Sequence, residues 1–201
     1  VGDVADTGPK LGQFDVIYGI AVLEHLPDVP RVARALRPLL APGGIAFLQG
    51  EPIWGGSVGH HVWFDPVQGP DPERFAAGGS RTARAMAYAF NDPATNPIPD
   101  WAHLVLSPDE LRAHLVADGL PEDHAAGIVD YVYNLSGAHV GSCSNFQVAS
   151  AIIDGFSEAF AVHPDRQQYD VAPNEFHARA RARHSEEDLQ TLGLRLWMRG
   201  R

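Results

Sequence analysis

Cysteine is almost absent from this chain of 201 residues, in which Cys143 is the single example. One cysteine excludes an intramolecular disulfide framework and a CxxC metal site, and a buried inert thiol is the expected state. Long apolar runs are also missing, since none approaches the roughly 20 residues of a membrane-spanning helix. The N-terminus lacks the basic and apolar regions of a signal peptide. We therefore expect a cytoplasmic protein with no membrane partner.

Positive charge is scarce as well. Lysine and arginine total 15 against 25 acidic residues, and the net charge is −10. Phosphate binding normally needs a basic face, so nucleic acid is not an expected partner. The one basic cluster, residues 177–184, alternates with alanine and is expected to be a solvated helix face. With 45% hydrophobic residues, the chain has enough apolar material for the core of one globular domain.

Residues 14–50 carry the strongest structural pattern. Phe14 to Val22 is almost continuously apolar and β-branched, which is typical of a strand covered on both faces in a parallel sheet. From Val29 to Leu40, apolar residues recur at three- and four-residue steps with arginines between them, which predicts a one-sided helix. Pro42, Gly43 and Gly44 end this helix, and Ile45 to Leu48 begin a second strand. The pattern is a βαβ unit, and ligands of such units bind beyond the carboxyl ends of the strands, here 19–25 and 49–54.

Further elements follow from local signals. Ser107, Pro108 and Glu110 form a capping box that predicts a helix over Pro108 to Ala117, and Pro121 begins another helix that runs to about Asn134. Ser144 and Gln147 repeat the capping pattern before a helix that ends near Phe156. The remaining predictions are a helix over 80–90, a strand over 159–163, a helix over 185–192 ended by Gly193, and a last strand over 194–198.

Residues 14–50 resemble the second half of the class I S-adenosylmethionine-dependent methyltransferase domain. In that family the fourth strand reads much like FDVIYGIAVLEHL, and the turn before the fifth reads like LRPLLAPGG. Gly2 and Asp3 look like the Gly-Asp at the end of the third strand. The segments GHHVW, IPDWAHLVLSPDEL and 194–199 resemble members with an insertion after the fifth strand.

The resemblance implies an α/β fold, a partial Rossmann-like sheet of strands four to seven with a mostly helical insertion after the fifth strand. We expect a single partial methyltransferase domain over 1–201. Its sheet core would lie in 1–50 and about 156–201, and a loop and helical insertion of about 51–155 would be a candidate acceptor lid.

The chain departs from the family at its start. No strand, glycine-rich turn and acidic second strand stand in the required order, so we expect a fragment. In the family the fourth strand lies beside the first. Loss of the first strand would leave Phe14 to Ile20, the counterpart of the fourth, as an exposed apolar edge. This predicts self-association through that edge.

The implied cofactor is S-adenosyl-L-methionine. By resemblance, Asp3 and the backbone of Val4 would meet adenine, while Tyr18, Gly19 and Ala21 would pass close to the methionine part. Gly19 has a reason of its own, because a glycine inside a strand often marks close approach of a ligand or another backbone. A packing glycine is the alternative.

Acceptor contacts are expected from two segments. Glu24 and His25 follow the first strand, and a neutral histidine is a credible base near physiological pH. The second segment, GHHVWFD at residues 59–65, is the more specific clue to the acceptor. Adjacent histidines of an extended chain point to opposite sides, so one of His60 and His61 would reach the pocket. The catalytic candidates are His25, His60 and His61. The substrate-binding candidates are Glu24, Gly59, Trp63, Trp101 and His103. Each also has a structural alternative, such as a histidine that binds loop carbonyls or an aromatic ring packed in the core.

The predicted function is methyl transfer to a small-molecule or sugar hydroxyl, or to an amine, by the parent protein. One alternative is a non-catalytic relic or interaction module. Another is a metallohydrolase built on His60, His61 and His103 with Asp65 or Glu51. Because the spacing fits no HExxH-type signature, no metal is expected.

Overall fold

A mixed four-stranded sheet organises the computed structural model, which describes residues 4, 11–62, 96–134 and 146–200. The strands are β1 (Phe14–Gly19), β2 (Leu40–Gly50), β3 (Phe160–Gln168) and β4 (Thr191–Gly200), in the order β1-β2-β4-β3. β1 and β2 are parallel, and β4 is antiparallel to both of its neighbours. A mixed α/β fold is thus confirmed, while the numbering of its strands as four to seven and the insertion stay predictions.

Helices α2 (Val29–Leu36) and α8 (Ala149–Ser157) pack with one face of the sheet in a single apolar core. α2 begins at Asp28, whose side chain accepts a hydrogen bond from Arg31 N at 2.9 Å, and it buries one apolar stripe as the spacing predicted. It is shorter than predicted, because the chain tightens into a 3-10 turn, Arg37–Leu39, and Leu40 already opens β2.

The opposite face of the sheet and the β1 edge are exposed. Val16, Tyr18 and Ile20 keep 62%, 75% and 60% of their surface, and Trp197 on β4 keeps 50%. The register aligns Tyr18 with Phe47 and Phe47 with Trp197, so these side chains share the open face. The prediction that this strand is covered on both faces is therefore wrong for β1. The predicted exposed edge is what the structure has.

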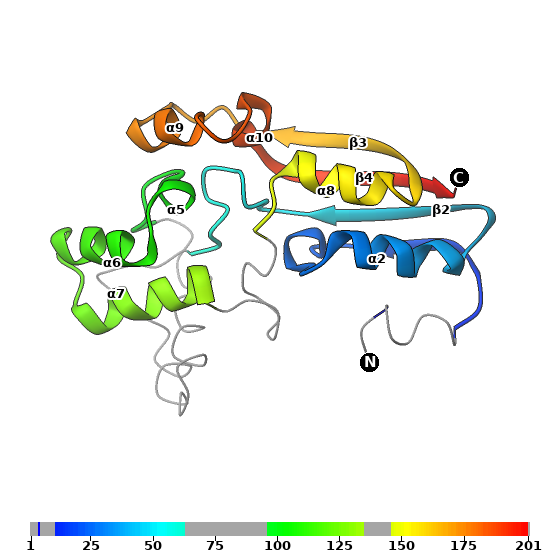
Figure 1. The fold of residues 1–201 in the computed structure, drawn as a ribbon, viewed down its shortest axis with the longest axis horizontal. Helices are drawn as coiled ribbons and strands as arrows, with labels where there is room; N and C mark the ends of the chain where they lie inside the picture. The colour runs from blue at the N-terminus through cyan, green and yellow to red at the C-terminus, as the bar shows by residue number, and fades with distance from the viewer. Residues whose placement is uncertain (1–3, 5–10, 63–95, 135–145, 201) are drawn as a thin grey trace.

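A second apolar core lies beyond the end of β2, toward which the β2 arrow points in Figure 1. It is formed by α5 (Ala102–Val105), α6 (Pro108–Ala117) and α7 (Glu122–Val129), together with α9 (Glu175–Ala180) and α10 (Glu186–Gln190). α7 continues as a π turn over Asp130–Asn134. The capping box of α6 is present with both of its hydrogen bonds, as predicted.

Two local predictions fail, and a third holds only in part. α8 begins after Val148, which does not cap it with a side chain, so Gln147 is not the third helical residue. Gly193 does not end a helix, because α10 stops at Gln190 and Gly193 pairs with Gln167 inside the sheet. The predicted solvated face of residues 177–184 holds for Arg179, Arg181 and Arg183, which are exposed, but not for His177, which is 3% exposed and whose Nε2 lies 3.1 Å from Glu186 Oε1.

Some predictions fall outside the described residues. They concern Asp3, Trp63, Asp65, Cys143, Ser144 and the helix over 80–90. Within the described part, no helix combines the length and apolarity needed to cross a membrane. The division into sheet core and insertion also stays a prediction. The packing shows that α8 shares the core of the sheet, whereas Phe176 and Leu189 pack with α5–α7.

Candidate functional site

Two loops meet at the carboxyl ends of the parallel strands. The first contains the 3-10 turn Leu23–His25 after β1, and the second is the segment 51–62 after β2. The first loop is fastened to the end of β2, because Val22 N donates to the carbonyl of Gln49 at 3.0 Å and Ala21 N donates to its side-chain Oε1 at 3.2 Å. This is the end of an open α/β sheet at which ligands bind.

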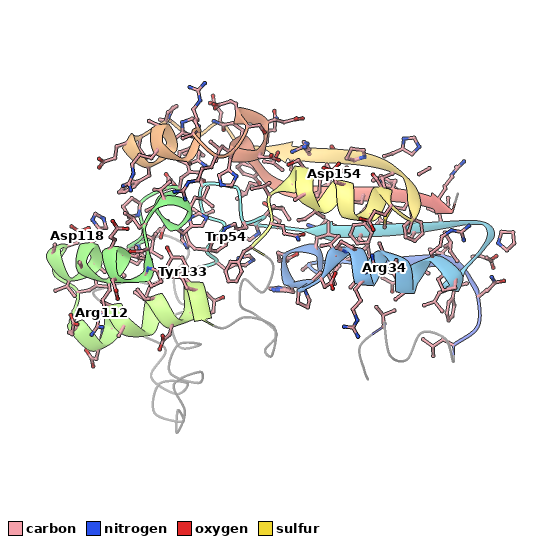
Figure 2. The ribbon with its side chains drawn as sticks, viewed as in Figure 1. Arg34, Trp54, Arg112, Asp118, Tyr133 and Asp154 are labelled. Atoms are coloured by element: carbon pink, nitrogen blue, oxygen red, sulfur yellow. The ribbon has the colours of Figure 1, made fainter. Side chains whose placement is uncertain are left out.

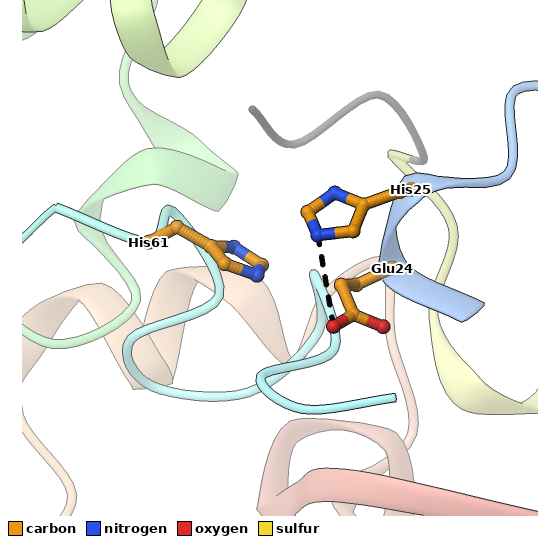
Figure 3. Close-up of side chains that lie close together, drawn as sticks. All are labelled: Glu24, His25 and His61. Atoms are coloured by element: carbon orange, nitrogen blue, oxygen red, sulfur yellow. Dashed lines mark ion pairs between the residues drawn. The ribbon is translucent and has the colours of Figure 1, made fainter. Parts of the chain in front are cut away.

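Glu24, His25 and His61 lie together where these loops meet (Figure 3). Glu24 Oε1 is 3.8 Å from His25 Nε2, and the rings of His25 and His61 are 5.7 Å apart between centroids. One potential ligand atom from each residue lies within 4.8 Å of the other two. Glu24 and His61 are 3% and 2% exposed, whereas the His25 side chain keeps 24% of its surface. The group is therefore buried on one side and open on the His25 side.

Burial controls the charge of this group. It raises the pKa of Glu24, although the neighbouring His25 and backbone hydrogen bonds oppose the rise. Burial also lowers the pKa of His61 to about 4, against a smaller opposing effect of the Gly59 carbonyl. A neutral His61 has one protonated nitrogen. Its Nδ1 is 3.0 Å from the Gly59 carbonyl and must be the donor, so Nε2 keeps its lone pair.

Two glycines allow this packing. A Cβ atom on Gly50, the last residue of β2, would collide with Glu24 Oε2 and lie 2.7 Å from Leu23 Cβ. A Cβ on Gly59 would lie 2.6 Å from the Ile53 carbonyl oxygen and collide with that of Trp54. Gly59, predicted to contact substrate, thus has a structural reason for being glycine, and its substrate role stays a prediction. Gly50 was missed by the sequence analysis, although a glycine closing a buried strand was a signal for close approach.

His60, His103 and Trp101 point into the second core instead. His60 Nδ1 accepts a hydrogen bond from Val62 N at 3.0 Å, and the His60 ring lies 5.1 Å from that of His103. His103 Nε2 donates to the Trp54 carbonyl at 2.8 Å, and Trp101 Nε1 donates to the Leu189 carbonyl at 3.0 Å. All three are at most 2% exposed. The three histidines of the metallohydrolase alternative are therefore not gathered, because His61 turns to Glu24 and His25 while His60 and His103 are bonded elsewhere.

Three of the residues predicted to meet the cofactor, Tyr18, Gly19 and Ala21, lie at or just after the end of β1. Tyr18 and Ala21 are exposed, so they leave that end of the strand open. A Cβ on Gly19 would lie 2.8 Å from Val22 Cγ1 and 2.9 Å from Leu48 Cδ2, so its close approach is to packed side chains. Val4 packs against the core of the sheet. Their cofactor roles stay predictions.

Two strained backbone positions lie at the site, and a third lies in the second core. Among the described residues other than glycine, three have positive φ: Ala21 at 50°, His61 at 60° and Trp101 at 61°. Ala21 lies just before the Glu24 turn and His61 is part of the group itself. Such conformations cost free energy and gather at functional positions.

Comparison with known proteins points to one chemistry. Residues 2–91 match the family model described as a methyltransferase domain. A segment of 37 residues is 51% identical to proteins named ubiquinone biosynthesis O-methyltransferase from Pseudomonas paraeruginosa (strain PA7) and Pseudomonas aeruginosa (strain PAO1). The segment covers 18% of this chain and 16% of each relative. No solved structure matches. The resemblance to the methyltransferase family is thereby confirmed.

Proposed function

We propose that the parent protein transfers a methyl group from S-adenosylmethionine to a small-molecule or sugar acceptor. The acceptor group would be a hydroxyl or, alternatively, an amine. The proposal starts from the methyltransferase domain that residues 2–91 match. The observation that carries the acceptor side is the grouping of Glu24, His25 and His61 beyond the parallel pair β1–β2. Similarity to proteins named O-methyltransferases favours an oxygen acceptor. The chain matches only 16% of their length, so their activity enters here as a proposal.

The chain fits one side of the methyl donor. The exposed Tyr18 and the Ala21 backbone border an open strand end, which can receive the part of the cofactor assigned to them. When bound, S-adenosylmethionine supplies a strongly activated methyl group. The protein's main task is then to hold the acceptor in line, and positioning can contribute on the order of 7–11 kcal/mol.

A hydroxyl acceptor must also lose a proton. A positioned base accelerates such a step by about 10²- to 10⁴-fold. His25 is the most accessible member of the group and lies 3.8 Å from Glu24, so it can contact an acceptor from the open side. His61, neutral because its pKa is depressed to about 4, presents a lone pair from the buried side. His60, the third catalytic candidate, is bonded within the second core and is not part of the group.

Donor binding and product formation test this proposal. We expect the isolated chain to bind S-adenosylhomocysteine weakly or not at all in calorimetric titration, since it fits only one side of the donor. Extracts incubated with the full-length parent should yield a product heavier by one methyl group, as seen by mass spectrometry.

Micromolar binding by the isolated chain would contradict the expectation of weak binding, although not methyl transfer itself, because it would show that these 201 residues hold a donor site. A parent protein that carries in-frame upstream sequence yet neither binds the donor nor methylates any acceptor would favour the non-catalytic interaction module.

A further inference from the structure

We propose that Glu24, His25 and His61 form a site for one divalent transition-metal ion, with zinc as the reference case, whose open coordination position takes an acceptor oxygen. The role of the acceptor oxygen rests on the methyl transfer proposed above, whereas the binding of the ion does not. This set differs from the histidine set that the sequence offered for a metal, because it shares only His61 with it.

The geometry is close to that of a bound ion. Three donors each about 2.1 Å from a tetrahedral zinc ion are separated by about 3.4 Å from one another. Glu24 Oε1 and His25 Nε2 are 3.8 Å apart, and all three donor atoms fit within 4.8 Å. Small side-chain rotations would bring them into coordination. The 3.8 Å separation is too long for a direct hydrogen bond, so Glu24 and His25 form only a loose ion pair.

The buried carboxylate provides a second, independent observation. Glu24 is 3% exposed, and its Oε2 is a buried atom with no hydrogen-bond partner among the described residues. A buried carboxylate that is only partly satisfied is costly unless a positive charge compensates it. Gly50 forms the wall behind Oε2 and leaves no room for another residue there. The ion pair with His25 compensates this carboxylate only when His25 is protonated, and a cation on the side of His25 and His61 would supply the charge when it is neutral (Figure 3).

His61 is prepared for ligation by its own loop. Histidines that bind metals almost always donate their second ring N–H to a carbonyl or carboxylate, which fixes the ring and the tautomer. His61 makes this contact to the Gly59 carbonyl at 3.0 Å. Its Nε2 is then the ligand atom, and the left-handed backbone at φ 60° holds the ring in this direction.

The ligand set selects a class of metal. Two imidazoles and one carboxylate suit Zn²⁺ and its neighbours Mn²⁺, Fe²⁺ and Co²⁺, whereas Mg²⁺ and Ca²⁺ prefer oxygen ligands. Three protein ligands leave at least one coordination position open, as in catalytic rather than structural zinc sites. The partly exposed His25 leaves the entry side open to a small ligand.

The ion would replace the histidines as the means of activation. Bound to it, an acceptor hydroxyl acidifies, its O–H bond breaks with the electron pair left on oxygen, and the proton leaves to solvent. His25 and His61 would then use their lone pairs on the ion and could not act as bases at the same time. The site deepens the proposed function by favouring acceptors with an oxygen that can coordinate a metal.

Metal binding by the purified 201-residue chain tests the site directly. Cobalt(II) is a suitable probe, because its visible absorption reports nitrogen and oxygen ligation, and calorimetry with zinc measures affinity and stoichiometry. We expect one equivalent to bind. Glu24→Gln and His61→Gln should each weaken binding by about 100-fold. Loss of a residue that only orients a ligand can already weaken metal binding this much, and loss of a ligand should cost at least as much. His25→Gln serves as a further ligand variant that the fold tolerates, since this side chain is partly exposed.

The matched control is His163→Gln, which removes an exposed imidazole from β3 and should leave binding unchanged. Circular dichroism shows whether each variant is folded. The proposal is overturned if no stoichiometric binding occurs, or if folded Glu24, His25 and His61 variants bind as tightly as the control. Because the titration needs no methyl donor, it can succeed even if the parent proves to have no methyltransferase activity, and it can fail without affecting that activity.

Discussion

His60 and His61 are neighbours in sequence with opposite surroundings. His61 faces Glu24 and His25 beyond the carboxyl ends of β1 and β2, while His60 is fully buried beside His103. The sequence predicted that only one of the pair would reach the pocket, but not which one. That choice depends on the left-handed backbone of His61, and a local pattern does not reveal such a conformation for a residue other than glycine.

The buried His103 makes stability depend on pH. Burial lowers the pKa of His103 from 6.5 to about 4. The hydrogen bond to the Trp54 carbonyl opposes this shift, and the neighbouring His61 and His184 add to it. Between these values the unfolded chain binds a proton that the folded chain does not, so stability falls as pH falls from 6.5 to 4. The contribution of His103 amounts to about 2 kcal/mol between pH 6.5 and 5.

Urea unfolding at pH 5, 6 and 7 should show that His103→Gln reduces the slope of stability against pH. The slope, not the absolute stability, is the readout. It will not fall to zero, since burial also depresses the pKa of His60. His163→Gln, exposed on β3, should keep the wild-type slope. An unchanged slope in the His103 variant would mean that this imidazole does not titrate as described.

Gly50→Ala tests the wall behind Glu24. The added methyl group would collide with Glu24 Oε2 and crowd Leu23, so we expect a loss of about 1–3 kcal/mol in the free energy of unfolding, as for an overpacked core. Gly43→Ala is the control on the same strand. It has positive φ but open space around its Cβ, so it reports backbone strain alone. Gly50→Ala should also weaken cobalt binding, whereas Gly43→Ala should not. Equal losses in cobalt affinity for both variants would show that Gly50 has no special relation to the Glu24 group.

At the scale of elements, prediction succeeded where the signal was local. The start of α6 follows from Ser107, Pro108 and Glu110, which lie within one turn of each other. Ser107 and Glu110 make the capping bonds that the pattern implies. Gly193 shows the opposite case. It looked like a helix terminator, yet its position is set by pairing with Gln167 on β3, a contact that no local pattern contains.

Ser107→Ala should weaken α6. The Ser107 hydroxyl accepts from Glu110 N at 3.3 Å, and Glu110 Oε2 accepts from Ser107 N at 2.7 Å. Loss of an N-cap side chain costs about 1 kcal/mol, which thermal or urea unfolding would detect. Ser107→Thr keeps the hydroxyl and should stay within a few tenths of the wild type. A Thr variant as unstable as the Ala variant would show that packing at this position, and not the cap, is responsible.

The whole molecule has one covered and one open sheet face. α2 and α8 lie on the covered face, while Val16, Tyr18 and Trp197 are exposed on the other. β1 is also an edge strand, since it pairs only with β2 in the described sheet. An apolar edge with unpaired backbone groups invites pairing with another chain. The apolar pattern of residues 14–22 predicted a strand covered on both faces, whereas the family resemblance predicted the exposed edge. The two differ because exposure depends on which strands are neighbours, and a local pattern does not contain that information.

We therefore expect the isolated chain to self-associate through β1. Sedimentation velocity over a range of concentrations should show species larger than the monomer, and Val16→Lys should shift them toward monomer by placing a charge on the open face. Val116→Lys, on the exposed side of α6, is the matched control and should not change the distribution. A wild-type chain that stays monomeric at every concentration would refute this expectation.

The assembly of the site depends on the register between β1 and β2. Gly19 pairs with Leu48 in that register, and Val22 N donates a hydrogen bond to the Gln49 carbonyl. A slip of one residue between β1 and β2 would move every side chain of one strand to the other face and carry Glu24 away from His61. Correct alignment is thus the condition for all three donors to meet. An ion that binds only the assembled group would act as a template during refolding, and it would draw the population toward the native pairing of these two strands.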